Sequence, residues 1–192
     1  MSFISVFTTN KFTSIMCDGR VHNAITKQII DEDYKKIRQY GNFLIGVVGN
    51  PGILDTFEKN LHLINHSFDY YSINELLKAL FSMKIYQDDG NPAYAHAVLT
   101  GRNLKGNFFV NVYSNLEPEV DKLNYECNIQ DRMNFITLPP SDCKIDANSV
   151  VGLLYRGDNS EDKIVQMQKT LNDVISDNAI SVNKNTFNLV LY

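Results

Sequence analysis

Short runs of β-branched and aromatic residues dominate the first fifty positions of the chain. Residues 3–9 and 12–17 are two such runs, separated by a polar pair, and this pattern predicts a β-hairpin. Residues 36–40 and 43–48 repeat the pattern around Gly41-Asn42. The sequence therefore predicts two pairs of strands before any helix.

The middle of the chain changes to helical periodicity. A first helix is predicted from Asn50-Pro51-Gly52 to about Ile64, because apolar residues recur there every three or four positions. A second helix is predicted from Ser72 to about Tyr86, with Ser72 as the N-cap and Glu75 three residues later completing a capping box. An acidic stretch containing Gly and Pro follows and returns the chain to strands.

The second half holds four strand-like runs, then a helix and a last strand. The runs cover residues 94–100, 107–113, 125–129 and 134–138. The first two flank a turn at residues 101–106, and the other two are expected to extend the same sheet. Residues 150–155 are predicted as a short helix, residues 160–175 as a long amphipathic helix, and residues 186–192 as a terminal strand.

This order of elements predicts an α+β fold. Strands, two helices, strands, a helix and a strand are what a four-layer αββα sandwich gives, with two antiparallel sheets between helices. The chain has 192 residues, enough for one well-buried core, and no repeat or low-complexity linker divides it. Residues 1–192 are therefore expected to form a single domain.

Composition narrows the class of function. The formal net charge is −4 and the sequence pI is near 5.5, so a general nucleic-acid binder is not expected. No stretch approaches the roughly 20 apolar residues that cross a bilayer, and the N-terminus lacks the pattern of a signal peptide. We expect a cytoplasmic protein with neither nucleic acid nor membrane as a partner.

Cysteine and histidine spacing predicts no cofactor and no metal. Cys17, Cys127 and Cys143 are widely spaced, which suggests neither a disulfide framework nor a zinc site. Cys17 as a nucleophile is disfavoured, because it lies inside an apolar strand pattern where a small buried Cys is common. His62 and His66 are four residues apart on the first predicted helix and would need a third ligand to hold a metal, so exposed histidines are the favoured interpretation.

Ser2 is the strongest candidate for chemistry. A small residue after Met1 generally leads to removal of the methionine, and Ser2 would then carry a free α-amine beside its own hydroxyl. That amine has an ordinary pKa near ~8, and a neighbouring cation such as Lys36 would lower it, leaving the neutral amine to accept the hydroxyl proton. Nucleophile and base from one residue is the chemistry of an N-terminal nucleophile hydrolase.

Four sequence features in order resemble the proteasome β-subunit family, and most closely its bacterial HslV-type members. Asp18 follows Ser2 by the sixteen positions that separate nucleophile and Asp in that family, and the chain continues as Asp18-Gly19-Arg20. Lys35-Lys36-Ile37-Arg38 matches a Lys-Lys-hydrophobic-Arg run whose second Lys is the active-site one. Gly46-Val47-Val48-Gly49 ends an apolar strand, where the family has a glycine N–H as oxyanion donor.

The resemblance implies a role for each of these residues. Ser2 Oγ attacks an amide carbonyl, Lys36 lowers the pKa of the Ser2 amine, Asp18 orients Lys36 beside Arg20, and the Gly49 N–H holds the oxyanion. The implied substrate is an amide, most commonly a peptide. The resemblance also implies a homo-oligomeric ring that encloses its sites and an ATP-dependent unfoldase as partner.

Two later sequence elements depart from the family. The Gly-Ser-Gly turn, whose Ser helps hold the terminal amine, corresponds here to residues 136–142, where Pro139-Pro140 replaces glycine and Ser141 is the substitute. The Asp-x-x-Ser element after the last long helix ends here at Ser181, with Asp177 displaced by one position.

These departures keep two further interpretations open. One is a non-catalytic relative that serves as an assembly or binding module with an unprocessed N-terminus, in which Asp18, Arg20 and Lys36 form a structural ion-pair cluster. The other is a small-molecule amidase on the same fold, which would need a pocket for its acyl group and no ring.

Overall fold

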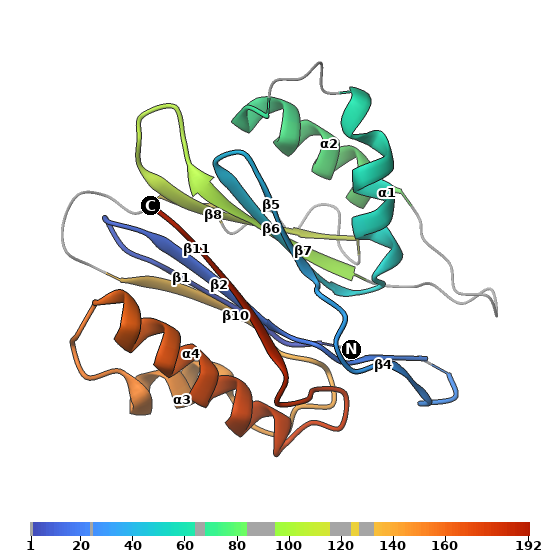
Figure 1. Cartoon of the computed structure of the whole chain (residues 1–192), viewed down its shortest axis with the longest axis vertical. Coiled ribbons are helices and arrows are strands. Elements are labelled where there is room, and N and C mark those ends of the chain that lie inside the picture. Colours follow the sequence, from blue (N-terminus) through green and yellow to red (C-terminus); the bar gives the residue numbers. More distant parts are fainter. Residues whose placement is uncertain (1, 24, 64–67, 84–94, 116–123, 127–132) are drawn as a thin grey trace.

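Two antiparallel sheets pack face to face, and two helices cover the outer face of each (Figure 1). The computed structural model describes residues 2–23, 25–63, 68–83, 95–115, 124–126 and 133–192. Within them the arrangement is the αββα sandwich that the order of elements predicts.

The first sheet has four strands in the order β10-β1-β2-β11. These strands are β1 (Ile4–Thr8), β2 (Thr13–Asp18), β10 (Asn134–Leu138) and β11 (Thr186–Leu191). β1 pairs with both β2 and β10, so that Ile4 lies opposite Cys17 on one side and Leu138 on the other. The N-terminal strand β1 is thus an inner strand of this sheet, with β10 on one side and β2 on the other.

The second sheet has five strands in the order β5-β6-β7-β8-β9. They are β5 (Ile37–Tyr40), β6 (Phe43–Gly49), β7 (Ala95–Arg102), β8 (Phe108–Ser114) and β9 (Asn124–Glu126). Between β2 and β5 in the sequence, β3 (Val21–His22) and β4 (Ile29–Asp31) form a small separate hairpin that the sequence patterns did not predict.

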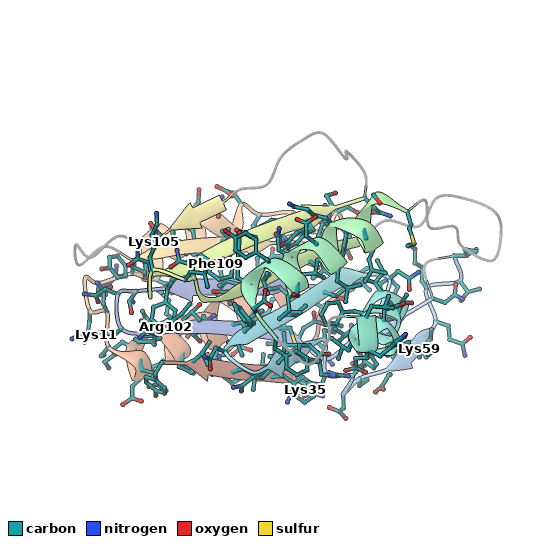
Figure 2. All side chains as sticks on the ribbon, turned by 90° about the horizontal axis from the view of Figure 1, so that it is seen from above. Lys11, Lys35, Lys59, Arg102, Lys105 and Phe109 are labelled. Carbon is teal, nitrogen blue, oxygen red and sulfur yellow. The ribbon has the colours of Figure 1, made fainter. Side chains whose placement is uncertain are left out.

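The helices lie outside the sheets in two pairs. α1 (Gly52–Asn60), the short η1 (Leu61–Leu63) and α2 (Tyr70–Ser82) cover the five-stranded sheet, while α3 (Ala147–Leu154) and α4 (Glu161–Ser176) cover the other sheet. Phe109 of β8 lies under α2, with its ring edge-on to Tyr70 at 4.9 Å between centroids (Figure 2). None of the helices in the described part of the chain has the length and apolar character that a bilayer crossing requires.

Three hydrophobic clusters hold the four layers together, because side chains alternate along each strand. In β6, Phe43, Ile45 and Val47 face the α1–α2 layer, whereas Leu44 and Val48 face the other sheet. The third cluster fills the space between the first sheet and α3–α4. The apolar runs of the sequence are therefore buried on both faces.

Gly46 lets the sheets approach each other in the middle of β6. A Cβ at this position would lie 2.7 Å from Ile15 Cδ1 and 2.8 Å from Ile4 Cδ1, closer than van der Waals contact allows. The glycine therefore sets the spacing of the sheets a few residues before the end of the strand that carries Gly49.

The structure corrects two sequence predictions. β10 does not extend the sheet of β7 and β8 but pairs with β1 in the other sheet. The N-cap of α2 is Asp69 rather than Ser72, because the Asp69 side chain accepts a hydrogen bond from the Ser72 amide at 2.9 Å. The predicted continuation of this helix over residues 84–86 and of a strand over residues 127–129 lies outside the described residues.

Candidate active site

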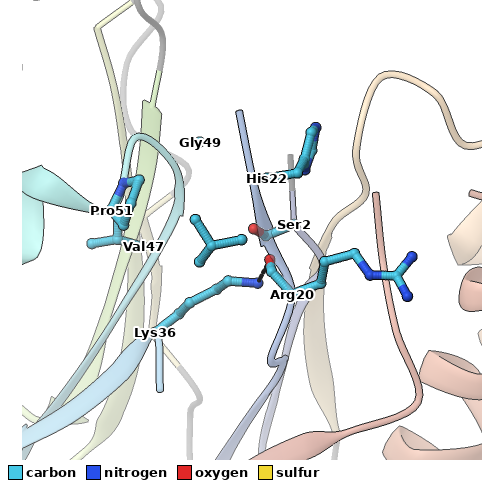
Figure 3. Close-up of a pocket in the computed structure, with 8 residues that line it drawn as sticks. Ser2, Arg20, His22, Lys36, Val47, Gly49 and Pro51 are labelled. Atoms are coloured by element: carbon cyan, nitrogen blue, oxygen red, sulfur yellow. Dashed lines mark hydrogen bonds between the residues drawn. The ribbon is translucent and has the colours of Figure 1, made fainter. Parts of the chain in front are cut away.

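A buried ion pair joins the two sheets at one end of the sandwich. Lys36, directly before β5, places its Nζ 2.8 Å from Oδ2 of Asp18, the last residue of β2. Both side chains are almost fully buried, with 3% and 0% of their surface exposed. Lys36 Nζ also donates a hydrogen bond of 2.6 Å to the Arg20 carbonyl (Figure 3).

The Asp18 carboxylate also fixes backbone on both sides of the ion pair. Its Oδ1 accepts a hydrogen bond from the Phe3 amide at 2.8 Å, and its Oδ2 accepts one from the Arg20 amide at the same distance. Phe3 directly follows Ser2, so Asp18 links the position of Lys36 to that of the N-terminal backbone.

Burial of Lys36 shifts the pKa of its ammonium group. Desolvation lowers the pKa of the Lys36 ammonium below its ordinary 10.5, while the charge of Asp18 and its hydrogen bond oppose that shift. Lys36 is thus a buried cation, and the Asp18 carboxylate is its counter-charge.

Ser2, Lys36 and Gly49 line the same small pocket (Figure 3). Its volume of about 20 Å³ has room for roughly one water molecule. Its remaining walls come from Arg20, Val21, His22, Val47 and Pro51. Gly49 ends β6 with φ of 92°, a backbone conformation that side-chain-bearing residues rarely adopt. The structure therefore brings together the candidate nucleophile, cation and oxyanion donor.

His22 belongs to this pocket although the sequence did not single it out. It lies in β3, and burial lowers the pKa of its imidazole to about 4, so the ring is neutral at pH 7. Its only sequence signal was its place four residues after Asp18.

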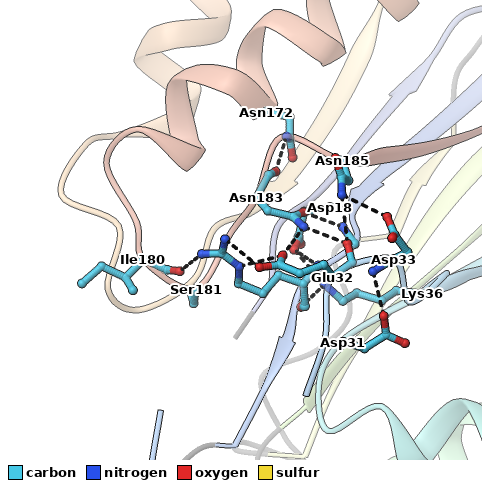
Figure 4. Close-up of polar contacts among 12 residues, drawn as sticks. Asp18, Asp31, Glu32, Asp33, Lys36, Asn172, Ile180, Ser181, Asn183 and Asn185 are labelled. Carbon is cyan, nitrogen blue, oxygen red and sulfur yellow. Dashed lines mark hydrogen bonds and ion pairs between the residues drawn. The ribbon is translucent and has the colours of Figure 1, made fainter. Parts of the chain in front are cut away.

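Arg20 contributes its backbone to the pocket and sends its side chain elsewhere. The guanidinium bonds both carboxylate oxygens of Glu32 at 3.1 Å and donates to the Ile180 carbonyl at 2.6 Å (Figure 4). Arg20 thus ties the turn after β2 to the segment after β4 and to the loop between α4 and β11.

The two later serines occupy different settings. Ser181 is buried, and its hydroxyl donates to Asp142 Oδ1 at 2.5 Å while its amide donates to Asp142 Oδ2 at 3.0 Å. Burial alone would raise the pKa of Asp142, but these bonds from Ser181 outweigh it and lower the pKa. Ser141 is exposed on the neighbouring turn. The sequence did not identify Asp142, whose partner lies 39 residues away.

The remaining candidates do not form a second site. Cys17 is buried in β2, and desolvation raises the pKa of its thiol to about 12, which leaves it unreactive near neutral pH. In the part of the chain that the structure describes, no cluster of three His, Cys, Asp or Glu side chains suits a metal. His66, the second residue of the histidine pair, lies outside the described residues.

Sequence comparison and structure comparison give different results for this chain. No protein-family model matches it, and no curated protein matches it. Among solved structures, Anbu (Gly-1 mutant) from Hyphomicrobium sp. strain MC1 superposes with a TM-score of 0.70 at 14% identity, over 100% of this chain and 81% of that one. Anbu (ancestral beta-subunit) from Yersinia bercovieri gives 0.67 at 12% identity, over 98% and 81% of the two chains.

The eukaryotic HslV from Trypanosoma brucei matches over 98% of both chains, with a TM-score of 0.61 and 12% identity. HslV-type proteins are also the family members that the sequence features between Ser2 and Gly49 resemble most closely. The chain therefore has the fold of these proteins, as the sequence resemblance predicted, and identities this low establish the fold alone.

Proposed function

We propose that this protein is an HslV-like N-terminal nucleophile hydrolase that cleaves amide bonds in peptides, with Ser2 as nucleophile after removal of Met1. The observation that carries the proposal is the buried Lys36–Asp18 ion pair at the pocket that Ser2 and Gly49 also line. A buried charge pair is costly to desolvate, so its place beside a candidate nucleophile favours a role in chemistry over one in stability.

The reaction follows from the groups at the pocket. The neutral α-amine of Ser2, directly or through one water, takes the proton from the Ser2 hydroxyl as Oγ bonds to the substrate carbonyl carbon. The carbonyl oxygen becomes an oxyanion that the Gly49 N–H stabilises. The amine then protonates the leaving nitrogen as the amide bond breaks, and water hydrolyses the resulting ester to restore Ser2.

Lys36 and Asp18 set up this proton transfer. The positive charge of Lys36 disfavours protonation of a nearby ammonium, so it lowers the pKa of the Ser2 amine and raises its neutral fraction near pH 7. Asp18 holds the Lys36 ammonium at 2.8 Å and the Phe3 amide at 2.8 Å, which fixes the cation relative to Ser2. The Arg20 carbonyl supplies the second acceptor for Lys36.

Ser181 and Ser141 complete the set as orienting residues. Ser181 is the better supported of the two, because Asp142 anchors both its hydroxyl and its amide. Ser141 is adjacent to Asp142, and we assign its orienting role to the turn that the two residues share. Neither serine is assigned a covalent step.

The assembly and its setting are part of the same proposal. As the sequence resemblance to the HslV-type family implies, the protein forms homo-oligomers in the cytoplasm and receives peptide substrate from an ATP-dependent unfoldase. A second candidate function is a non-catalytic assembly module of the same fold. The exposure of Ser141 next to Pro139-Pro140 favours it, because a serine that holds the terminal amine would be expected inside the site.

Peptide hydrolysis by matched variants tests the proposal. Wild-type protein lacking Met1 is expected to hydrolyse at least one member of a panel of peptidyl-aminocoumarins, Ser2→Thr to retain that activity, and Ser2→Ala to lose it. Ser82→Ala, at the exposed end of α2, is the control and should match wild type. Equal activity in Ser2→Ala and wild type would reject Ser2 as the nucleophile, and no hydrolysis by a folded, Met1-free wild type would favour the assembly module.

A further inference from the structure

The Asp18-Gly19-Arg20 turn carries both hydrogen-bond acceptors of the Lys36 ammonium. Asn183 fixes this turn through a hydrogen bond with Gly19. Asn183 is nearly buried in the loop between α4 and β11, and its Oδ1 accepts the Gly19 amide at 3.0 Å. Its Nδ2 donates to the Glu32 carbonyl at 2.8 Å and to Glu32 Oε2 at 2.5 Å (Figure 4). One amide side chain therefore joins the turn after β2 to the segment after β4.

Glu32 makes the second set of contacts to this turn, and we call Asn183 and Glu32 together the clamp. Its carboxylate bonds the Arg20 guanidinium through both oxygens, and these hydrogen bonds lower the pKa of Glu32, so it stays ionised at neutral pH. Gly19 allows the close approach, since a Cβ there would lie 2.4 Å from the Glu32 carbonyl oxygen. The turn is thus held through Gly19 and through Arg20 at once.

The loop that presents Asn183 is itself anchored. Asn172 of α4 is fully buried, and its Nδ2 donates to the Asn183 carbonyl at 2.8 Å. A series of hydrogen bonds, to side chains and to backbone, therefore runs from α4 through Asn183 and Glu32 to the turn at residues 18–20, and from there to Lys36 Nζ. Asn172 and Asn183 are buried, so water competes little for the hydrogen bonds that they make, whereas Arg20 and Glu32 are partly exposed.

We infer that Asn183 and Glu32 are positioning residues for Lys36. They hold the Asp18-Gly19-Arg20 turn so that Asp18 Oδ2 and the Arg20 carbonyl stay 2.8 and 2.6 Å from the Lys36 ammonium. Neither residue lines the pocket. Their catalytic consequence rests on the proposed function, whereas their effect on Lys36 does not.

The test uses two variants and one matched control. Asn183→Leu has a similar shape and removes all three side-chain bonds, and Glu32→Gln removes the charge from a half-buried side chain that a stable fold tolerates. Asn185→Leu is the control, because the exposed Asn185 side chain bonds Asp33 and the Glu32 carbonyl but neither Gly19 nor Arg20. The Gly19 amide also donates to the Asn185 backbone carbonyl at 2.9 Å, and every variant keeps that carbonyl. Asp18, Arg20 and Cys17, the titratable groups that act on Lys36, remain in every variant.

The first readout is titration of the Lys36 ammonium by NMR in ¹⁵N-lysine-labelled protein, with Lys36→Met assigning the signal. Loosened acceptors stabilise the charged form less, so the Lys36 midpoint should move to lower pH in Asn183→Leu and Glu32→Gln and stay in place in Asn185→Leu. An unchanged midpoint in both folded variants overturns the inference, whether or not the protein is an enzyme.

The second readout is the rate at which a peptide β-lactone acylates Met1-free protein across pH. A displaced Lys36 should slow acylation at pH 7 by about tenfold or more and move the midpoint of the pH–rate profile upward. A lower melting temperature with an unchanged rate and profile would reduce both residues to a structural role. If wild type is not acylated at all, the proposed function fails and the titration alone decides the inference.

Discussion

Lys36 Nζ and Asp18 Oδ2 are separated by 2.8 Å at the junction of two different sheets, and both side chains are almost fully buried. The pair therefore depends on the whole sandwich being assembled, and it in turn fixes the backbone of Phe3 beside Ser2. A network of this kind couples stability of the fold to the geometry of the N-terminus.

Removal of one partner of the pair should be costly. Asp18→Asn leaves the Lys36 ammonium buried without its counter-charge, and we expect the free energy of unfolding to fall by about 3–5 kcal/mol in urea titrations at pH 7. Asp177→Asn is the matched control, because it breaks an exposed ion pair with Lys184 of 2.7 Å and should leave the free energy of unfolding close to that of wild type. Equal losses in the two variants would mean that the buried ion pair contributes no more to the free energy of unfolding than the exposed one.

Two glycines should respond to alanine in opposite directions. Gly46→Ala places a methyl group 2.7 Å from Ile15 Cδ1 between the sheets and should destabilise by about 1–3 kcal/mol, reduced if the ends of the isoleucines rotate away. Gly152→Ala in α3 meets nothing within 4 Å and should stabilise by about 0.5–1 kcal/mol through helix propensity. Thermal unfolding of the two variants measures both shifts, and a stabilised Gly46→Ala would mean that the sheets are less tightly packed there.

His22 should make stability fall in acid. Its folded pKa of about 4 lies below the ordinary 6.5 because burial disfavours the charged ring, so the unfolded chain binds more protons between these values. The contribution of His22 is therefore present above pH 6.5 and is lost as pH falls towards 4. Urea unfolding at pH 7 and 4.5 should show a smaller acid loss in His22→Gln than in wild type.

His62→Gln is the control for that measurement, since it removes an exposed imidazole from η1. Acid also protonates carboxylates such as Glu32 and Asp142, so the informative quantity is the difference between each variant and wild type. An acid loss in His22→Gln equal to that of wild type would place the ring in a more solvated setting than the structure gives it.

Most of the fold was accessible from the sequence because its strands are buried on both faces. Continuous apolar runs such as residues 43–48 indicate such strands directly, and the four features between Ser2 and Gly49 fall within fifty residues of one another. The pairing of β10 was not accessible, because Ile4 and Leu138, which lie opposite each other, are 134 positions apart in the sequence. Two runs that follow each other in sequence predict neighbouring strands, and here the chain changes sheets instead.

The polar shell of the site was the least predictable part. Asn183 and Glu32 are 151 residues apart, and Asp142 and Ser181 are 39 apart, so no local pattern connects them. The N-cap of α2 shows the same limit at short range. Asp69 and Ser72 are both good capping residues, and only the geometry shows that the Asp69 carboxylate receives the Ser72 amide.

The central claim is that Ser2 is an N-terminal nucleophile, and the intact mass of the protein expressed without N-terminal additions tests it most directly. Mass spectrometry before and after exposure to a peptide β-lactone should show a species without Met1 that gains one acyl equivalent, with the gain lost in Ser2→Ala. A protein that keeps Met1 and gains no mass, or an adduct that persists in Ser2→Ala, would contradict the claim.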